Sequence, residues 1–298
     1  MTDQPRFAVH TASIPQVPDV AEAIRVVARS GATGVGLFQG QFTAGREAEY
    51  REVIAECGLT PTCFVPEMWT IYPPAFAGAD QRQDPKERVD RICDDVAKLA
   101  DFRPEIIVVG PGTSGDPGRP IGRVEEVILG VRQIADVAAE HGLQVGFELL
   151  AERRGSPLYT VPQMMSAIEA VDRENVGIMF DFFHSWCEPD IHDRLRRHAP
   201  SINSVQINDI KVVERSGADR ELPGLGRNVA PALIAALLEG GYDGWWELEV
   251  LSDDGRLGVE LPDSYWRHPA AELLARARSQ FQRCWAEAQR LLQKGPGR

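Results

Sequence analysis

The sequence predicts a single closed barrel of eight parallel strands and eight helices, the (β/α)8 or TIM-barrel fold, over residues 1–298. The main observation is a pattern that recurs eight times: a short apolar strand, a loop, an amphipathic helix and a Gly-containing turn. Strictly alternating strands and helices form a parallel sheet. Eight such units also match the usual size of this barrel, about 250 residues or more. No change in composition marks a second domain. With eight units in this length, a doubly wound open sheet is the less favoured alternative.

The strands are predicted from short runs that are largely apolar. The run EIIVV, for example, is apolar throughout after its first residue, as expected for a parallel strand that is covered on both faces. The predicted strands are residues 7–12, 34–38, 60–65, 105–109, 144–149, 176–181, 202–208 and 245–250.

The helices are predicted from apolar residues that recur every three or four positions and from signals at the helix ends. Gly31 follows the first helix, and Thr160 with Pro162 forms a suitable start for the fifth. The predicted helices are residues 19–30, 46–57, 85–101, 121–141, 161–171, 190–198, 229–239 and 270–292.

A long segment, PEMWTIYPPAFAGADQRQDP, separates the third strand from the third helix. Loops of this length in a compact domain are usually functional or disordered. The aromatic residues Trp69, Tyr72 and Phe76 favour a packed lid. Together with residues 255–266, this loop is expected to shape the substrate pocket. Trp69 and Trp186 are expected to contact the substrate.

The composition narrows the class of protein. A net charge of −12 argues against a nucleic-acid binder, which needs a basic face, and against binding to an anionic membrane surface. No apolar run approaches the ~20 residues that span a bilayer. The five cysteines are scattered without CxxC spacing, so we expect a reducing compartment and no disulfide framework. The sequence therefore predicts a cytoplasmic protein that acts on a small molecule, as a monomer or as a homo-oligomer.

Polar side chains gather at the C-terminal ends of four consecutive strands, where barrels of this kind build their active sites. These residues are Glu148, Asp181, Gln206 and Glu249. Read singly, each could be a strand-end residue paired with a neighbouring helix. Three converging carboxylates would repel one another unless a cation held them together. Because the donors are all oxygens, the pattern predicts one divalent ion, Mn²⁺ or Mg²⁺ rather than Zn²⁺.

Three further residues belong to the same predicted site. Glu247 points to the same side as Glu249 but lies lower, so it is expected deeper in the barrel or hydrogen-bonded to a neighbour. His184 is expected on the loop after Asp181, as a substrate contact rather than a ligand, and His10 at the same barrel mouth. The other histidines are expected at the surface: His141, His192, His198 and His268.

The motifs VGFELL, MFDFFHSW, SVQINDI, LPGLGRN and GYDGWWELEV, in this order, resemble the sugar phosphate isomerase/epimerase superfamily, the xylose-isomerase-like TIM barrels. The resemblance implies that Glu148, Asp181, Gln206 and Glu249 bind one metal ion and that His184 contacts substrate. Gln206 stands where the epimerases have His. In this respect the sequence is similar to the hydroxypyruvate isomerases, which have Gln at this place. The arginine that epimerases place after strand seven has no secure match. Lys211 and Arg215 are close in the sequence to the position of that arginine but do not align with it.

Three functions are compatible with this site. The first is an isomerase or epimerase acting on an unphosphorylated sugar or cyclic keto-polyol through an enediolate, with Glu148 and Glu249 moving the proton. The second is a lyase, such as an inosose or 3-dehydroshikimate dehydratase or a C-glycoside-cleaving subunit, with His184 as acid. The third is a barrel subunit without catalysis. The sequence predicts the first.

Overall fold

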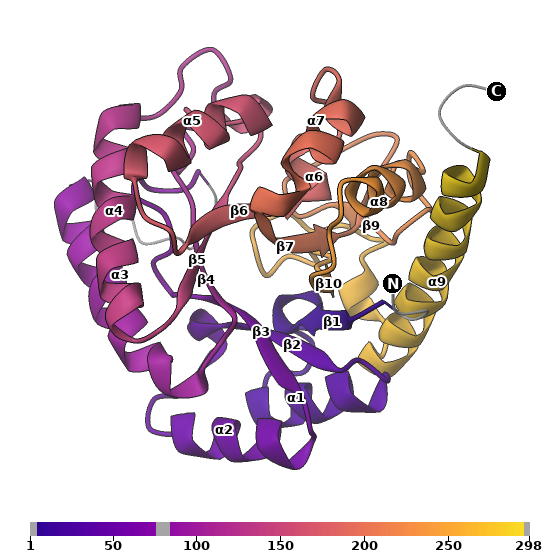
Figure 1. Cartoon of the computed structure of the whole chain (residues 1–298). Helices are drawn as coiled ribbons and strands as arrows, with labels where there is room; N and C mark the ends of the chain where they lie inside the picture. Colours follow the sequence, from indigo (N-terminus) through magenta and orange to yellow (C-terminus); the bar gives the residue numbers. More distant parts are fainter. Residues whose placement is uncertain (1–4, 76–83, 295–298) are drawn as a thin grey trace.

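The computed structural model describes residues 5–75 and 84–294, which form a closed barrel of parallel strands surrounded by helices (Figure 1). The strand order around the ring is β1-β10-β7-β6-β5-β4-β3-β2, and β1 pairs with both β2 and β10. The barrel strands are β1 (Phe7–His10), β2 (Gly34–Phe38), β3 (Thr60–Val65), β4 (Ile106–Val109), β5 (Gln144–Glu148), β6 (Val176–Asp181), β7 (Ile202–Ile207) and β10 (Trp246–Leu248). The predicted fold class is therefore confirmed.

The helices lie outside the strands, where each buries one apolar face. Two predicted starts are present: Oδ1 of Asp19 accepts the amide of Glu22, and Thr160 forms a capping box with Gln163. The helices are α1 (Val20–Arg29), α2 (Glu47–Glu56), α3 (Pro85–Leu99), α4 (Val124–Glu140), α5 (Val161–Val171), α6 (Phe182–Ser185), α7 (Ile191–His198), α8 (Ala230–Glu239) and α9 (Ala270–Lys294). The four-residue helix α6 is not among the predicted elements.

Several element ends differ from the predicted ones by one to three residues. The first strand ends at His10 because a 3-10 helix, Thr11–Ser13, follows it. The fourth helix begins at Val124, after the extended Arg123. The last helix continues to Lys294. These shifts leave the strand order and the predicted site unchanged.

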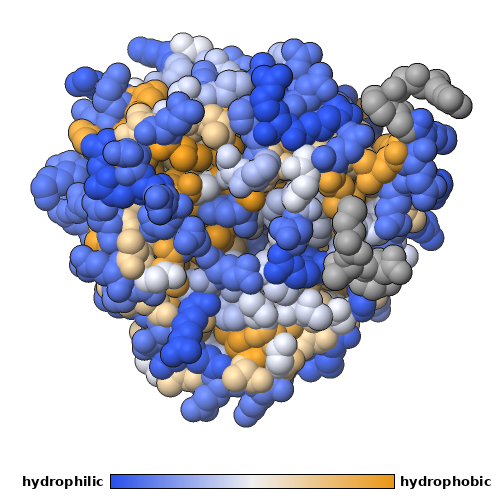
Figure 2. All heavy atoms as spheres, in the orientation of Figure 1, coloured by the Kyte–Doolittle hydropathy of each residue, from blue (hydrophilic) through white to orange (hydrophobic). Residues whose placement is uncertain are grey.

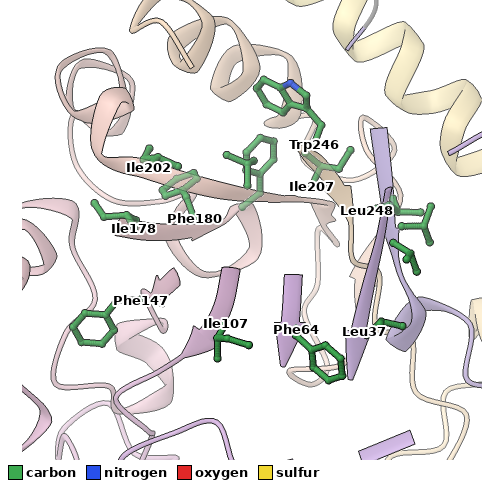
Figure 3. Close-up of a cluster of buried hydrophobic side chains, with 14 of the residues drawn as sticks. Leu37, Phe64, Ile107, Phe147, Ile178, Phe180, Ile202, Ile207, Trp246 and Leu248 are labelled. Carbon is green, nitrogen blue, oxygen red and sulfur yellow. The ribbon is translucent and has the colours of Figure 1, made fainter. Parts of the chain in front are cut away.

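Two separate groups of apolar side chains fill the molecule. The larger lies between strands and helices, and Figure 3 shows some of its members, including Ile107, Phe147 and Phe180, pointing away from the barrel centre. The smaller group, inside the barrel, consists of Cys63, Ile106, Val108 and Met179, with Val65 and Trp69 packed against it. Alternation of side chains along each strand separates the two groups. The barrel interior thus has a small apolar group of its own, beside the buried polar side chains that its strands also carry.

A short antiparallel ribbon, β8 (Asp209–Ile210) and β9 (Arg220–Glu221), follows β7. Asp209 holds it in place, because its two carboxylate oxygens accept the backbone amides of Ile210 and Gly224. The ribbon returns Arg220 to the barrel mouth, and the sequence did not predict it.

The surface seen in Figure 2 is mostly polar, with apolar side chains between charged ones. Across residues 5–75 and 84–294, no helix combines the length and the apolar character needed to cross a membrane. All five cysteines are free, and Cys187 is exposed. Phe76 lies outside the described residues.

Candidate metal centre and active site

The predicted ligands come together at the barrel mouth. Asp181 of β6 is in register with Gln206 of β7, and Gln206 is in register with Glu247 of β10. Glu148 ends β5, and Glu249 follows β10 by one residue. All five side chains belong to residues that are at most 9% exposed. The register thus brings together residues that lie far apart in the sequence.

Asp181 is held by donors from three elements. Its Oδ1 accepts the backbone amide of Phe183 at 2.9 Å and Nδ2 of Asn208 at 2.7 Å, while its Oδ2 lies 2.7 Å from Nη1 of Arg220. Burial raises the pKa of Asp181, although the charge of Arg220 opposes this shift. The residue both starts helix α6 and faces the cluster of carboxylates.

Arg220 is the site residue that the sequence did not predict. Its Nη1 lies 2.7 Å from Asp181 and 2.6 Å from Oε2 of Glu249, and its guanidinium stands 4.8 Å from the ring centroid of Phe183. It is 4% exposed. The sequence feature that could have pointed to Arg220 is its position shortly before the Leu-Pro-Gly turn, where the ribbon rejoins the barrel. The permanent positive charge of Arg220 therefore bonds to two of the three carboxylates of the site.

Glu148 is the carboxylate with the least compensation. Among the described residues no hydrogen bond reaches its carboxylate, and Nε2 of His184 lies 3.8 Å from Oε1. Burial, followed by the charges of Asp181 and Glu249, raises the pKa of Glu148 well above its usual value. A buried carboxylate of this kind calls for a cation, so the residues present fit a divalent ion.

His184 lies on helix α6 rather than on the predicted loop. Its Nδ1 accepts the backbone amide of Ala151 at 3.3 Å, which places the proton of the neutral ring on Nε2. Burial, then the nearby arginine charges, lowers the pKa of His184 well below 6.5. Nε2 lies 3.8 Å from both Glu148 and Asp181. These three side chains lie close enough to share an ion, but Nε2 of His184 could be a ligand only without the proton that it carries here.

The other residues predicted to contact the substrate lie in different parts of the molecule. His10 is buried, and its Nδ1 lies 3.7 Å from Oε1 of Glu249, so it lies at the mouth as expected. Trp69 packs on the apolar group inside the barrel. Trp186 packs against the strand–helix core instead, with Arg227 over its ring at 5.0 Å. The roles of these residues toward substrate remain predictions.

The charged residues outside the site are paired or at the surface. Lys211 and Arg215, the two candidates after strand seven, form ion pairs with Asp219 and Asp263 and so do not replace Arg220. Among the remaining histidines, His141, His192 and His268 are exposed, and His198 is half-buried.

The model of the xylose isomerase-like TIM barrel family matches residues 24–290. The chain belongs to this family. The match confirms both the fold class and the motif resemblance. A relative from Pseudomonas putida (strain KT2440), a 3-dehydroshikimate dehydratase, is 25% identical over 245 residues, which is 79% of this chain. The chain spans 36% of that relative's length.

Solved structures share the fold. An L-ribulose 3-epimerase aligns with a TM-score of 0.75 and 18% identity over 99% of both chains. The IolI protein, solved with a zinc atom, aligns with a TM-score of 0.72 and 15% identity, over 95% of this chain and 99% of that one. Both show what the barrel resembles in space, and the second holds a metal ion.

Proposed function

We propose that this protein is a divalent-cation-dependent lyase that removes water from an unphosphorylated, hydroxylated keto compound, after taking a proton from the carbon beside the ketone. The observation that carries the proposal is the convergence of Glu148, Asp181 and Glu249 on one site, where Arg220 is the arginine bonded to two of them. The dehydratase activity of the Pseudomonas putida relative supports the lyase over the isomerase.

The residues that would hold the metal ion also indicate its role in the reaction. Glu148, Asp181, Gln206 and Glu249 would hold Mn²⁺ or Mg²⁺, which when bound supplies a Lewis acid for the substrate carbonyl. Among the described residues no hydrogen bond reaches the Glu148 carboxylate, unlike a carboxylate paired with arginine, so its lone pairs are open to a proton. Glu249 has such a pairing, because Arg220 lies 2.6 Å from it. Glu148 is therefore the group that takes the proton from carbon.

The elimination of water requires no reactant other than the substrate and the side chains of the site. The carbon–hydrogen bond and the bond from the neighbouring carbon to its hydroxyl break, and a carbon–carbon double bond forms. The proton taken by Glu148 passes to the departing hydroxyl, which leaves as water. His184 presents Nε2–H 3.8 Å from Glu148, so it can orient that hydroxyl by a hydrogen bond. Glu148 ends in its starting state.

The substrate class follows from the charges around the mouth. Arg153 and Arg154 both bond to Glu214, at 3.0 and 2.9 Å, and Arg220 bonds to two carboxylates. A phosphorylated sugar would require an uncommitted cation or a helix N-terminus. Since these arginines are committed to carboxylates, the proposal favours an unphosphorylated substrate.

An isomerase or epimerase is the second candidate, and one observation favours it. Glu148 and Glu249 come from β5 and the end of β10, on two sides of Asp181 and Gln206, and the charge of Glu249 contributes to the raised pKa of Glu148. Two carboxylates so placed could remove a proton on one side and return it on the other.

Product analysis in D₂O separates the two reactions. Protein stripped with EDTA and reloaded with Mn²⁺ is incubated with 3-dehydroshikimate, a keto-inositol and a ketohexose, and products are followed by proton NMR and mass. A lyase gives a product lighter by one water, whereas an isomerase gives an unchanged skeleton with deuterium on carbon. Glu148→Gln should abolish turnover, and Glu188→Gln, a buried glutamate outside the site, should keep it. Full activity after EDTA treatment contradicts the proposal.

A further inference from the structure

A further buried carboxylate, that of Glu247, lies beside the proposed metal ligands. Glu247 is 0% exposed, and each of its oxygens accepts hydrogen bonds from neutral groups. Oε1 accepts from Sγ of Cys63 at 3.0 Å and from Nε2 of Gln206 at 3.3 Å, and Oε2 accepts from the Thr62 hydroxyl. The three donors come from β3 and β7, so this side chain links strands on two sides of β10.

The surroundings of Glu247 could at first suggest another metal site. His10, Cys63 and Glu247 each offer a ligand atom within 4.8 Å of the others. However, the thiol of Cys63 already donates to Glu247, and Nδ1 of His10 already accepts the backbone amide of Ala12 at 3.2 Å. With both of its oxygens bonded to neutral donors, Glu247 itself needs no ion, and within the cluster it is Nε2 of His10 that has no hydrogen-bond partner among the described residues.

The bond to Gln206 determines which way its amide points. A carboxylate can only accept, so the amide atom facing Glu247 must be the NH₂ group and not the carbonyl oxygen. The carbonyl oxygen of Gln206 is then the amide atom that does not face Glu247. Asp181 is the register neighbour of Gln206 on the side away from Glu247.

We propose that Glu247 is a positioning residue that orients the Gln206 amide so that its carbonyl oxygen is presented to the cation held with Asp181. This inference rests on the metal site of the proposed function. Partners behind a ligand commonly set its orientation in this way, and their loss typically weakens metal binding 10–100-fold. Gly36 belongs to the same arrangement, because a Cβ there would lie 2.4 Å from Oε2 of Glu247.

A double-mutant cycle on metal affinity tests the inference. Mn²⁺ is titrated by calorimetry into metal-free wild type, Glu247→Gln, Gln206→Ala and the double variant. A glutamine at position 247 offers an NH₂ group, which lets Gln206 reverse its amide, so Mn²⁺ should bind about tenfold more weakly. If Glu247 acts through Gln206, the double variant should bind no more weakly than Gln206→Ala. Effects that multiply would overturn the inference.

Two controls keep the outcome interpretable. Glu188→Gln, a buried glutamate that accepts the amide of Val161, should leave the affinity unchanged. If Glu247→Gln fails to fold, Thr62→Val removes a donor to Glu247 without changing charge, and its smaller effect should likewise vanish when Gln206 is Ala.

The titration also separates this inference from the proposed function. Two ions per chain would identify a second site at Glu247 and overturn the inference. Unchanged affinity in Glu247→Gln would overturn it while leaving the metal centre in place. An unaltered protein that binds no Mn²⁺ would remove both. No substrate is present, so the result is independent of the lyase assignment.

Discussion

Replacing Arg220 by methionine should destabilise the fold far more than the same change at an exposed arginine. The side chain is 5% exposed, and Nη1 lies 2.7 Å from Asp181 and 2.6 Å from Glu249. Removing one partner of a buried ion pair costs about 3–5 kcal/mol, because the other charge is left uncompensated. Two carboxylates lose the same partner in this variant, so we expect at least about 3 kcal/mol, or roughly a hundredfold change in the folding equilibrium.

Urea denaturation in EDTA, followed by tryptophan fluorescence, measures this loss. The midpoint should fall while the slope with urea stays the same, since the surface exposed on unfolding is unchanged. Arg29→Met is the matched control, because Arg29 is 61% exposed and pairs with the exposed Glu22. The control should unfold like wild type. An Arg220→Met protein as stable as wild type would refute the role of Arg220 as the permanent counter-charge of the site.

Three further predictions concern other parts of the molecule. Burial alone would raise the pKa of Asp219, but hydrogen bonds from Arg215 hold it below 3.8, so wild type should exceed Arg215→Met in urea midpoint above about pH 4. That gap should shrink as the pH falls further; a gap that widens below about pH 4 would contradict the pairing. Burial raises the pKa of Cys284 to about 12, so iodoacetamide at about pH 8 should label the exposed Cys187 first and leave Cys284 unmodified in the folded protein, as peptide mass analysis would show. Trp69→Ala should raise KM with little change in kcat if Trp69 contacts the substrate, and an unchanged KM would remove it from the pocket.

The barrel could be predicted because its signals are local. An apolar run such as that of β4, bounded by turn residues, is typical of a strand covered on both sides, and Gly31 or Thr160 marks a helix end within a few residues. Glu148 and Asp181 could be placed because a carboxylate at the C-terminal end of a barrel strand faces the mouth whatever its neighbours are.

Other features depend on contacts that no local pattern records. Helix α6 has four residues, which is too short for a periodic signal, so the sequence predicts a loop around His184. Arg220 reaches the site only because Asp209 anchors a ribbon of two-residue strands. The bond between Glu247 and Gln206 depends on the register of β7 with β10, which the sequence does not reveal. Of the two alternatives expected for Glu247, a deeper position or a hydrogen bond to a neighbour, the structure has the bond, which Gln206 donates.

The most direct test of the central claim is a Mn²⁺ titration of the metal-free protein together with its Asp181→Asn and Glu249→Gln variants. If the converging oxygens form one cation site, wild type should bind one ion per chain, and each variant should bind it at least about tenfold more weakly while remaining folded by circular dichroism. Wild-type affinity in both variants, or no binding by the unaltered protein, would contradict the metal centre.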